Sequence, residues 1–319
     1  MSFNSQMNHS YSLLYRRLTY TGHSNMKTRG LLVLLLSKAA GHPPNSIDFI
    51  DAQRSAGISQ RQRSLAEMTE MIYSAHLIHK GIVNLQPSLL VNSKKAQDLH
   101  FGNKMSVLSG DFLLASVWKG LGELRDTKVV ELMSIAVGDF MEGQFVIETE
   151  TDLPHLGKTS RTYWEERNFL RAGSLQANSC QSALALAGHG EELQLKAYEF
   201  GKNVALAWQA FTELQAFMES YMHPVNTVAA FELMSAPIIL HVENNGESFL
   251  STVIQGGEDG ETQIDYQRLH SIVRNGPGIE KTKELITLYT NNALDALQVF
   301  PPSDASKALA NIVYAIKEQ

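Results

Sequence analysis

The chain has 319 residues, of which 44% are hydrophobic and 19% are charged, and its net charge is −6 at pH 7. This length and composition are typical of a globular protein with a sizeable hydrophobic core. The mild acidity and the lack of a basic stripe argue against nucleic-acid binding, because phosphate recognition requires clustered Lys and Arg. The single cysteine, Cys180, excludes an internal disulfide framework and is interpreted as a small buried residue. No apolar run reaches the roughly eighteen residues that span a bilayer, so no transmembrane segment is predicted.

The N-terminal segment contains no acidic residue, and Asp48 is the first in the chain. Its Ser, Tyr and Leu content and the pair Arg16 and Arg17 give it a composition similar to that of a mitochondrial presequence. The alternative is an ordinary N-terminus without a targeting role, which predicts a cytoplasmic protein. We therefore set residues 1–25 apart as a poorly defined segment or presequence remnant, and expect one folded domain over 26–319.

Apolar residues recur at three- and four-residue spacing along most of the chain, and the alternating pattern of half-buried strands is scarce. The predicted helices, in chain order, cover residues 28–40, 63–84, 105–124, 127–146, 161–188, 190–220, 224–240, 263–274, 278–298 and 303–317. The predicted loops include residues 91–101 and 242–263. No internal repeat or linker divides the chain, so the sequence predicts an all-α, single-domain helical bundle.

Four segments, taken together and in order, resemble the trans-isoprenyl diphosphate synthases. They read LAEMTEMIYSAHLIH at 65–79, GNKMSVLSGDFLLASVWKG at 102–120, RAGSLQANSC at 171–180 and GKNVALAWQAFTEL at 201–214. The resemblance runs from about residue 27 to the end of the chain and implies a terpenoid synthase-like fold. It also implies a reaction in which an allylic diphosphate is ionised and coupled to isopentenyl diphosphate. In that family, two Asp-Asp-x-x-Asp motifs hold the Mg²⁺ ions that neutralise the departing diphosphate.

The two motif positions of this chain depart from the family pattern. The carboxylates of the first motif, which would follow His79, are replaced by Lys80, Gly81 and Asn84. The second motif falls on Thr212, Glu213 and Ala216, so one carboxylate remains. A lysine repels Mg²⁺, and a lone carboxylate is too few ligands for a metal cluster. The resemblance therefore implies a chain without catalytic residues and without a metal site of its own.

The positions on the substrate side are partly retained. The family's Arg-rich segment leaves Lys27 and Arg29, and its Lys-Thr pair corresponds to Arg171 and Ala172. Tyr73 replaces a family His that helps to bind isopentenyl diphosphate. The candidate remnant diphosphate site consists of Lys27, Arg29, Arg171 and Gln209, with Lys80 as a further cation. The alternative is a set of solvated cations around an old cleft.

The chain also resembles the divergent subunit of heteromeric decaprenyl and solanesyl diphosphate synthases. The shared segments include RGLLVLLLSKAAG, HKGIVNL and LSGDFLLA. In such assemblies an aspartate-rich polyprenyl diphosphate synthase subunit carries the catalysis and the Mg²⁺. The resemblance implies a non-catalytic, regulatory subunit of a mitochondrial heterotetramer, on the matrix side, that makes the isoprenoid side chain of ubiquinone. Peripheral association with a membrane is compatible with this role.

The family dimerises through helices that correspond to residues 105–120 and 128–144. The first of these is apolar on almost all sides, which requires burial within a domain or against a partner. We therefore expect the catalytic subunit to contact Phe112, Leu113, Val117, Trp118, Val130, Met133 and Phe140. For each of these residues, the alternative is the ordinary core of this chain.

Two other functions are compatible with the sequence. The chain is an independent prenyltransferase if non-standard carboxylates hold the metal, and the candidates are Asp111 with Glu213, or Asp48 with Asp51. It is a prenyl-lipid-binding or carrier protein if the old tunnel binds a prenyl diphosphate without catalysis.

Overall fold

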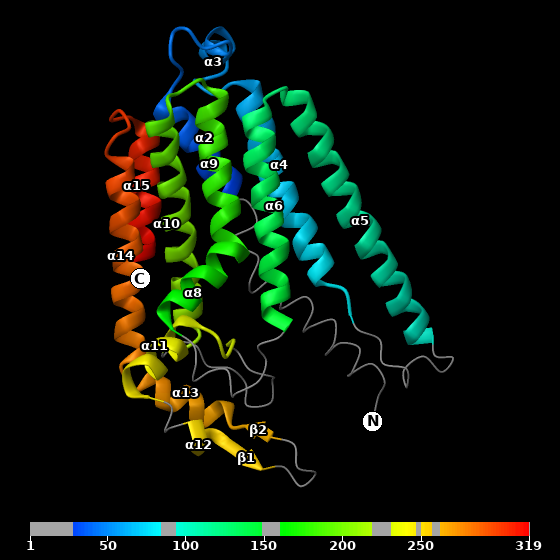
Figure 1. Cartoon of the computed structure of the whole chain (residues 1–319), viewed down its shortest axis with the longest axis vertical. Coiled ribbons are helices and arrows are strands. Elements are labelled where there is room, and N and C mark those ends of the chain that lie inside the picture. The colour runs from blue at the N-terminus through cyan, green and yellow to red at the C-terminus, as the bar shows by residue number, and fades with distance from the viewer. Residues whose placement is uncertain are drawn as a thin grey trace. The chain divides into compact units, whose positions relative to one another are not determined.

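The computed structural model describes residues 28–83, 94–148, 160–218, 231–246, 250–256 and 262–318. Over these ranges every element is a helix except one antiparallel pair of short strands, β1 (Ile254–Gly256) and β2 (Thr262–Ile264). The prediction of an all-α fold is therefore confirmed (Figure 1). No helix within the described ranges has the length and apolar character that a membrane crossing requires.

The contacts of the chain group its residues into two compact units. The first contains residues up to Leu132 together with Ser182–Gly190, and the second contains Met133–Gln181 and everything from Glu191 onward. Two helices, α6 (Thr127–Glu148) and α9 (Ser174–Leu186), contribute residues to both units.

The first unit is built around α4 (Gln60–Lys80), which packs on α2 (Thr28–Ala40) and α5 (Lys94–Leu124). A short helix, α3 (Phe49–Arg54), precedes it. The start of α4 is set by a capping box, in which Ser59 and Gln62 each accept a hydrogen bond from the other's backbone N–H. The contact with α2 is close at Gly30, where an added Cβ would lie 2.9 Å from the Ala66 carbonyl oxygen. The fully buried side chains of Leu36, Leu65 and Ile72 belong to this unit's core.

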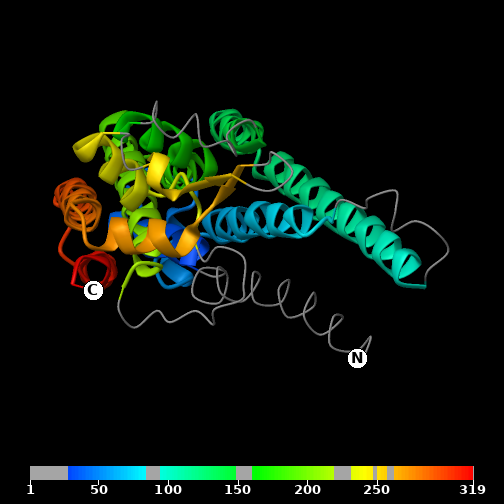
Figure 2. The same cartoon turned by 90° about the horizontal axis from the view of Figure 1, so that it is seen from below.

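The second unit is centred on α10 (Glu191–Gln215), which packs most extensively on α14 (Gly278–Leu297). Helix α15 (Asp304–Lys317) contacts both, and the two views show these three helices side by side (Figures 1 and 2). The remaining helical elements of this unit are α8 (Arg161–Asn168), the π-helical turn η2 (Phe169–Gly173), α11 (Ala236–Asn245), α12 (Leu250–Val253) and α13 (Tyr266–Arg274). Helix α11 contacts α14, α8 and α10, which places its first turn near the end of α10.

Most of the predicted helices are confirmed, some with shifted ends. Helix α2 has the predicted bounds, and Ser303 caps α15 through a hydrogen bond from Ser306 N. The predicted helix over 161–188 is interrupted by η2, and α4 starts before residue 63 because of its capping box.

Three predictions were wrong in part. Residues 94–101 are the exposed start of α5 and not a loop, because Lys, Ala and Gln are good helix formers even where they are polar. The helix predicted over 224–240 begins only at Ala236, where Pro237 lies in the first turn, and residues 224–230 lie outside the described ranges. The predicted loop over 242–263 includes the end of α11, the short helix α12 and β1, and Thr262 begins β2.

Close packing between α9 and α10 gives a test of the second unit. A Cβ on Gly201 would lie 2.7 Å from the Gln176 carbonyl oxygen and 3.0 Å from Sγ of Cys180, which is fully buried. Gly201→Ala is therefore expected to lower the free energy of unfolding by about 1–3 kcal/mol, since a backbone oxygen cannot easily move away. Gly122 is the control, because a Cβ there meets nothing within 4 Å. Gly122→Ala should raise the stability by up to about 1 kcal/mol through helix propensity, and urea denaturation that gave equal changes would contradict this packing.

Candidate functional site

The end of α4, where the first motif would begin, is docked on α5. The His79 ring lies against Gly110, so closely that a Cβ on Gly110 would overlap it. Nε2 of His79 is 3.4 Å from Oδ1 of Asp111 and 3.3 Å from the Val107 carbonyl oxygen. The Ser-Gly-Asp segment of α5 thus contacts the histidine ring through Gly110 and Asp111. Asp111, a candidate ligand for a non-standard metal site, faces this histidine.

The residues after His79 complete the turn out of α4. The Lys80 side chain is exposed, and Gly81 is the C-cap in a right-handed conformation with φ −75°. Asn103 then holds the departing chain, because its side chain accepts a hydrogen bond from Val83 N at 2.9 Å and donates one to Val83 O at 2.7 Å. This structural role of Asn103 was not predicted from the sequence. Asn84 lies outside the described residues.

Arg29, the described cation of the Arg-rich segment, lies on an aromatic ring. Its guanidinium carbon is 3.5 Å from the centroid of the Tyr73 ring, an arrangement in which the ring face attracts the cation. Glu70, one turn before Tyr73, accepts a hydrogen bond from Gly30 N at 2.7 Å. Burial raises the pKa of the Glu70 carboxyl, and the Gly30 bond and the charge of Arg29 offset part of that rise. Lys27 lies outside the described residues.

Glu213, the carboxylate that remains at the second motif, accepts three hydrogen bonds from the protein. Oε2 accepts from the indole N–H of Trp164 at 2.8 Å and from the backbone N–H of Ala236 at 2.7 Å, and Oε1 accepts from Nε2 of Gln209 at 2.8 Å. Burial raises the pKa of the Glu213 carboxyl, and the bonds from Ala236 and Gln209 lower it in part. The carboxylate thus connects α8, α10 and the first amide of α11.

The other two residues of the second motif have local roles. The Thr212 hydroxyl donates to the Trp208 carbonyl oxygen at 2.8 Å, one turn back along α10. Ala216 has a buried side chain just beyond the end of α10, and its carbonyl oxygen is 3.0 Å from Nε2 of His270. Neither side chain presents a carboxylate to a metal.

Arg171, which lies in η2, forms an ion pair with a carboxylate of the same unit. Its Nη1 is 3.1 Å from Oε2 of Glu232, and its Nη2 is 3.4 Å from Oε1. Arg167, one turn earlier on α8, donates to the same Oε2 at 3.1 Å. Neither Arg167 nor Glu232 was predicted as a site residue, because the two residues are 65 positions apart and no sequence pattern links them.

The residues at these positions do not fit a magnesium cluster. Among the described residues, no group of three or more His, Cys, Asp or Glu is arranged to hold a metal ion. The other candidate pair is engaged in the fold, since Asp48 forms an ion pair with Arg61 at 3.2 Å and Asp51 accepts from Gln60 N at 2.7 Å.

The residues expected to face a partner differ in their exposure. Val117, Met133 and Phe140 are buried within the chain, which agrees with their alternative interpretation as core residues. Phe112 and Trp118 are exposed, by 70% and 44%, and Leu113 and Val130 are partly exposed. The contact with a partner stays a prediction for the set as a whole.

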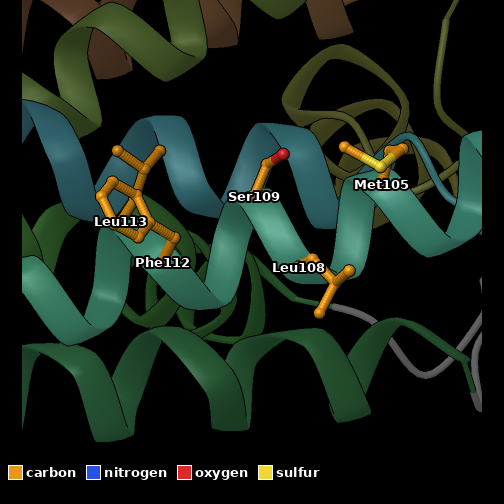
Figure 3. A pocket seen from close by; sticks show the side chains of 5 residues that line it. All are labelled: Met105, Leu108, Ser109, Phe112 and Leu113. Atoms are coloured by element: carbon orange, nitrogen blue, oxygen red, sulfur yellow. The ribbon is translucent and has the colours of Figure 1, made fainter.

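Four of the exposed apolar side chains of α5 form a stripe, which we call the α5 stripe: Phe101, Met105, Leu108 and Phe112. Their spacing of four, three and four residues places them on one side of a helix. A shallow apolar pocket of about 400 Å³ lies along the same helix and is lined by Met105, Leu108, Ser109, Phe112 and Leu113 (Figure 3). The first three residues of the stripe were not predicted, although the spacing in the sequence was a signal that could have identified them.

Comparison with known proteins matches residues 12–266 to the family described as Polyprenyl synthetase. The chain is 38% identical over 303 residues to the human protein named All trans-polyprenyl-diphosphate synthase PDSS2, which covers 94% of this chain and 74% of that one. It is 30% identical to the Probable hexaprenyl pyrophosphate synthase, mitochondrial, of Yarrowia lipolytica, over 81% of this chain and 57% of that one. The apo form of an Arabidopsis medium/long-chain length prenyl pyrophosphate synthase has the same fold, with a TM-score of 0.68, 24% identity and 97% of both chains covered.

Removing the Glu213 carboxylate tests its structural role. Glu213→Ala leaves three donors without their acceptor and is expected to lower the free energy of unfolding by about 2–4 kcal/mol. Glu243→Ala is the control, because Glu243 is an exposed residue near the end of α11 and should change the stability by less than about 0.5 kcal/mol. Urea denaturation of both variants measures the difference. A loss in Glu213→Ala no larger than in the control would show that the three bonds do not stabilise the fold.

The raised pKa of Glu70 predicts a dependence of stability on pH. The folded chain holds this proton more tightly than the unfolded chain, so the wild type loses stability as pH rises above the ordinary Glu value of 4.5. In Glu70→Gln, the amide oxygen keeps the bond to Gly30 N, and the amide N–H₂ replaces Oε2, a buried atom without a hydrogen bond among the described residues. The variant should therefore become more stable relative to the wild type between about pH 4 and pH 7. Parallel curves in urea denaturation over this range would contradict the raised pKa.

Proposed function

The chain belongs to the polyprenyl synthetase family, and from this premise we propose that it is the non-catalytic subunit of a heteromeric trans-polyprenyl diphosphate synthase. The proposal takes its reaction from the relatives, whose names describe polyprenyl and hexaprenyl diphosphate synthases. It assigns the ionisation of the allylic diphosphate and the Mg²⁺ to an aspartate-rich partner subunit. This chain contributes a folded scaffold of the same architecture.

The proposal is supported by the contacts that the remaining site groups make with other residues of the fold. Glu213 accepts three protein hydrogen bonds, Arg171 is paired with Glu232, and Arg29 lies on Tyr73. A carboxylate that binds Mg²⁺ must give lone pairs to the ion, and a diphosphate-binding arginine must give its N–H groups to phosphate oxygens. Both demands compete with contacts that this chain already makes. The same competition weighs against the carrier alternative, which depends on Arg29 and Arg171.

The α5 stripe is the surface we propose for the partner subunit. Large apolar side chains that lie exposed and contiguous on one helix are unfavourable in water and typical of protein interfaces. Phe112 lies at one end of the stripe and lines the pocket, so an apolar side chain of a partner would bury both. The partner that we propose for the α5 stripe is the catalytic subunit, because it would present a related α5 helix with a complementary apolar face. A heterotetramer then follows if each type of subunit is present twice.

The remaining parts of the proposal concern the place and product of the assembly. We propose that the assembly is mitochondrial, because a relative is named mitochondrial. The side that we propose is the matrix. The product is the isoprenoid chain of ubiquinone.

Chain elongation by this protein alone, by an aspartate-rich synthase subunit alone and by the two co-expressed tests the function. We expect Mg²⁺-dependent elongation only from the co-expressed pair, together with a complex that co-purifies. Elongation by this chain alone would exclude a non-catalytic subunit. Binding of a prenyl diphosphate by the isolated chain, without a stable complex in the mixture, would favour the carrier.

Substitution at the α5 stripe tests the contact with the partner. Phe112→Asp introduces a charge on the exposed apolar face and should reduce co-purification at least tenfold, because a desolvated carboxylate at an apolar interface is costly. Ile47→Asp is the control, since Ile47 is 94% exposed and lies outside the stripe. Both variants should retain the helical circular dichroism of the wild type. Equal co-purification of the two variants would remove the α5 stripe from the interface.

A further inference from the structure

Two guanidinium groups of the second unit lie one helical turn apart. Arg167 lies in the last turn of α8, and Arg171 lies in η2, the π-helical turn that follows. Arg167 is 4% exposed, and burial lowers the pKa of its guanidinium, with a further contribution from the positive charge of Arg171. Two like charges in a largely buried place repel each other and require an anion between or beside them.

The anion is the side chain of Glu232. Its Oε2 is 3.1 Å from Nη2 of Arg167 and 3.1 Å from Nη1 of Arg171, while its Oε1 is 3.4 Å from Nη2 of Arg171. Arg167 also donates to the Met234 carbonyl oxygen at 3.3 Å, so the segment of Glu232 is attached to α8 at a second point. Glu232 is 53% exposed, although both arginines are largely buried. In the described part of the chain, the solvent-exposed carboxylate of Glu232 therefore bridges both cations.

We propose that Glu232 is an internal plug in an anion site whose ligand is of the diphosphate class. The oxygens of Glu232 occupy positions to which two guanidinium forks donate, and a diphosphate offers oxygens to such forks in the same way. The carboxylate brings one negative charge, and the two arginines bring two positive charges. Glu232 therefore competes with an external anion for the same guanidinium N–H groups. Glu213 adds a second negative charge nearby, since its charge also acts on Arg167.

The plug follows from contacts within the second unit alone. The choice of diphosphate as the ligand rests on the proposed function, whereas the competition between a carboxylate and an anion does not. The plug explains how a chain could keep basic side chains at a substrate position without binding substrate. In this proposal, the absence of substrate binding depends on Glu232 as well as on the loss of metal ligands.

Titration of inorganic diphosphate into the full chain in metal-free buffer, followed by calorimetry, tests the plug. Glu232→Gln removes the charge and is expected to bind diphosphate at least tenfold more tightly than the wild type. Glu243→Gln is the matched control, because it makes the same change of net charge at an exposed position of α11 and should behave as the wild type. Adding Arg171→Gln to Glu232→Gln should abolish the gain. Equal affinity in the wild type and Glu232→Gln, or a gain that survives Arg171→Gln, would overturn the proposal.

A second variant, Glu232→Asp, retains the negative charge and keeps the proposal testable if Glu232→Gln misfolds. Circular dichroism checks the helical content of each protein before the titration. If Glu232→Gln does not fold, Glu232→Asp decides the question, because its carboxylate is one methylene shorter and cannot reach both guanidiniums at the same distances. It should bind diphosphate more tightly than the wild type, and unchanged affinity would overturn the plug. The titration contains no partner subunit, so its failure leaves the result of the co-expression experiment unaffected.

Discussion

The carboxylate of Glu213 joins three helices of the second unit, and the arrangement of that unit depends on it. The first amide of a helix has no acceptor within the helix, and the positive end of the helix dipole favours a negative charge there. Glu213, in the last turn of α10, supplies the acceptor and the negative charge for α11. It also accepts a hydrogen bond from the Trp164 indole of α8. One side chain thus links α8, α10 and α11, and α11 in turn packs on α14.

The groups that would carry chemistry in this family serve the structure of this chain. Arg29 lies over Tyr73, His79 is seated on Gly110, and Arg171 is paired with Glu232. Each contact replaces an interaction with solvent or ligand by one within the protein.

Helix α5 has two faces with different roles. One packs on α4, with Val117 fully buried and Met68 in contact with the position of Gly120. The other face presents the α5 stripe and the shallow pocket that is lined in part by residues of the stripe (Figure 3). The sequence shows a helix that is apolar on almost all sides, a pattern that requires cover on both faces. Among the described residues of the first unit, α4 covers one of these faces, and we propose a partner for the other.

The fold class, most helix positions and the residues at both motif positions could be predicted from the sequence, because they depend on local periodicity, capping residues and residue identity. Ser303 as a helix cap and the apolar stripes of α14 are examples. The tertiary structure alone decided that Glu213 is a helix anchor, that Glu232 pairs with Arg171 across 61 positions, and that Asn103 binds the backbone of Val83. These contacts could not be predicted from the sequence, because a hydrogen bond or ion pair between distant residues depends on how the helices pack. No local pattern records that packing.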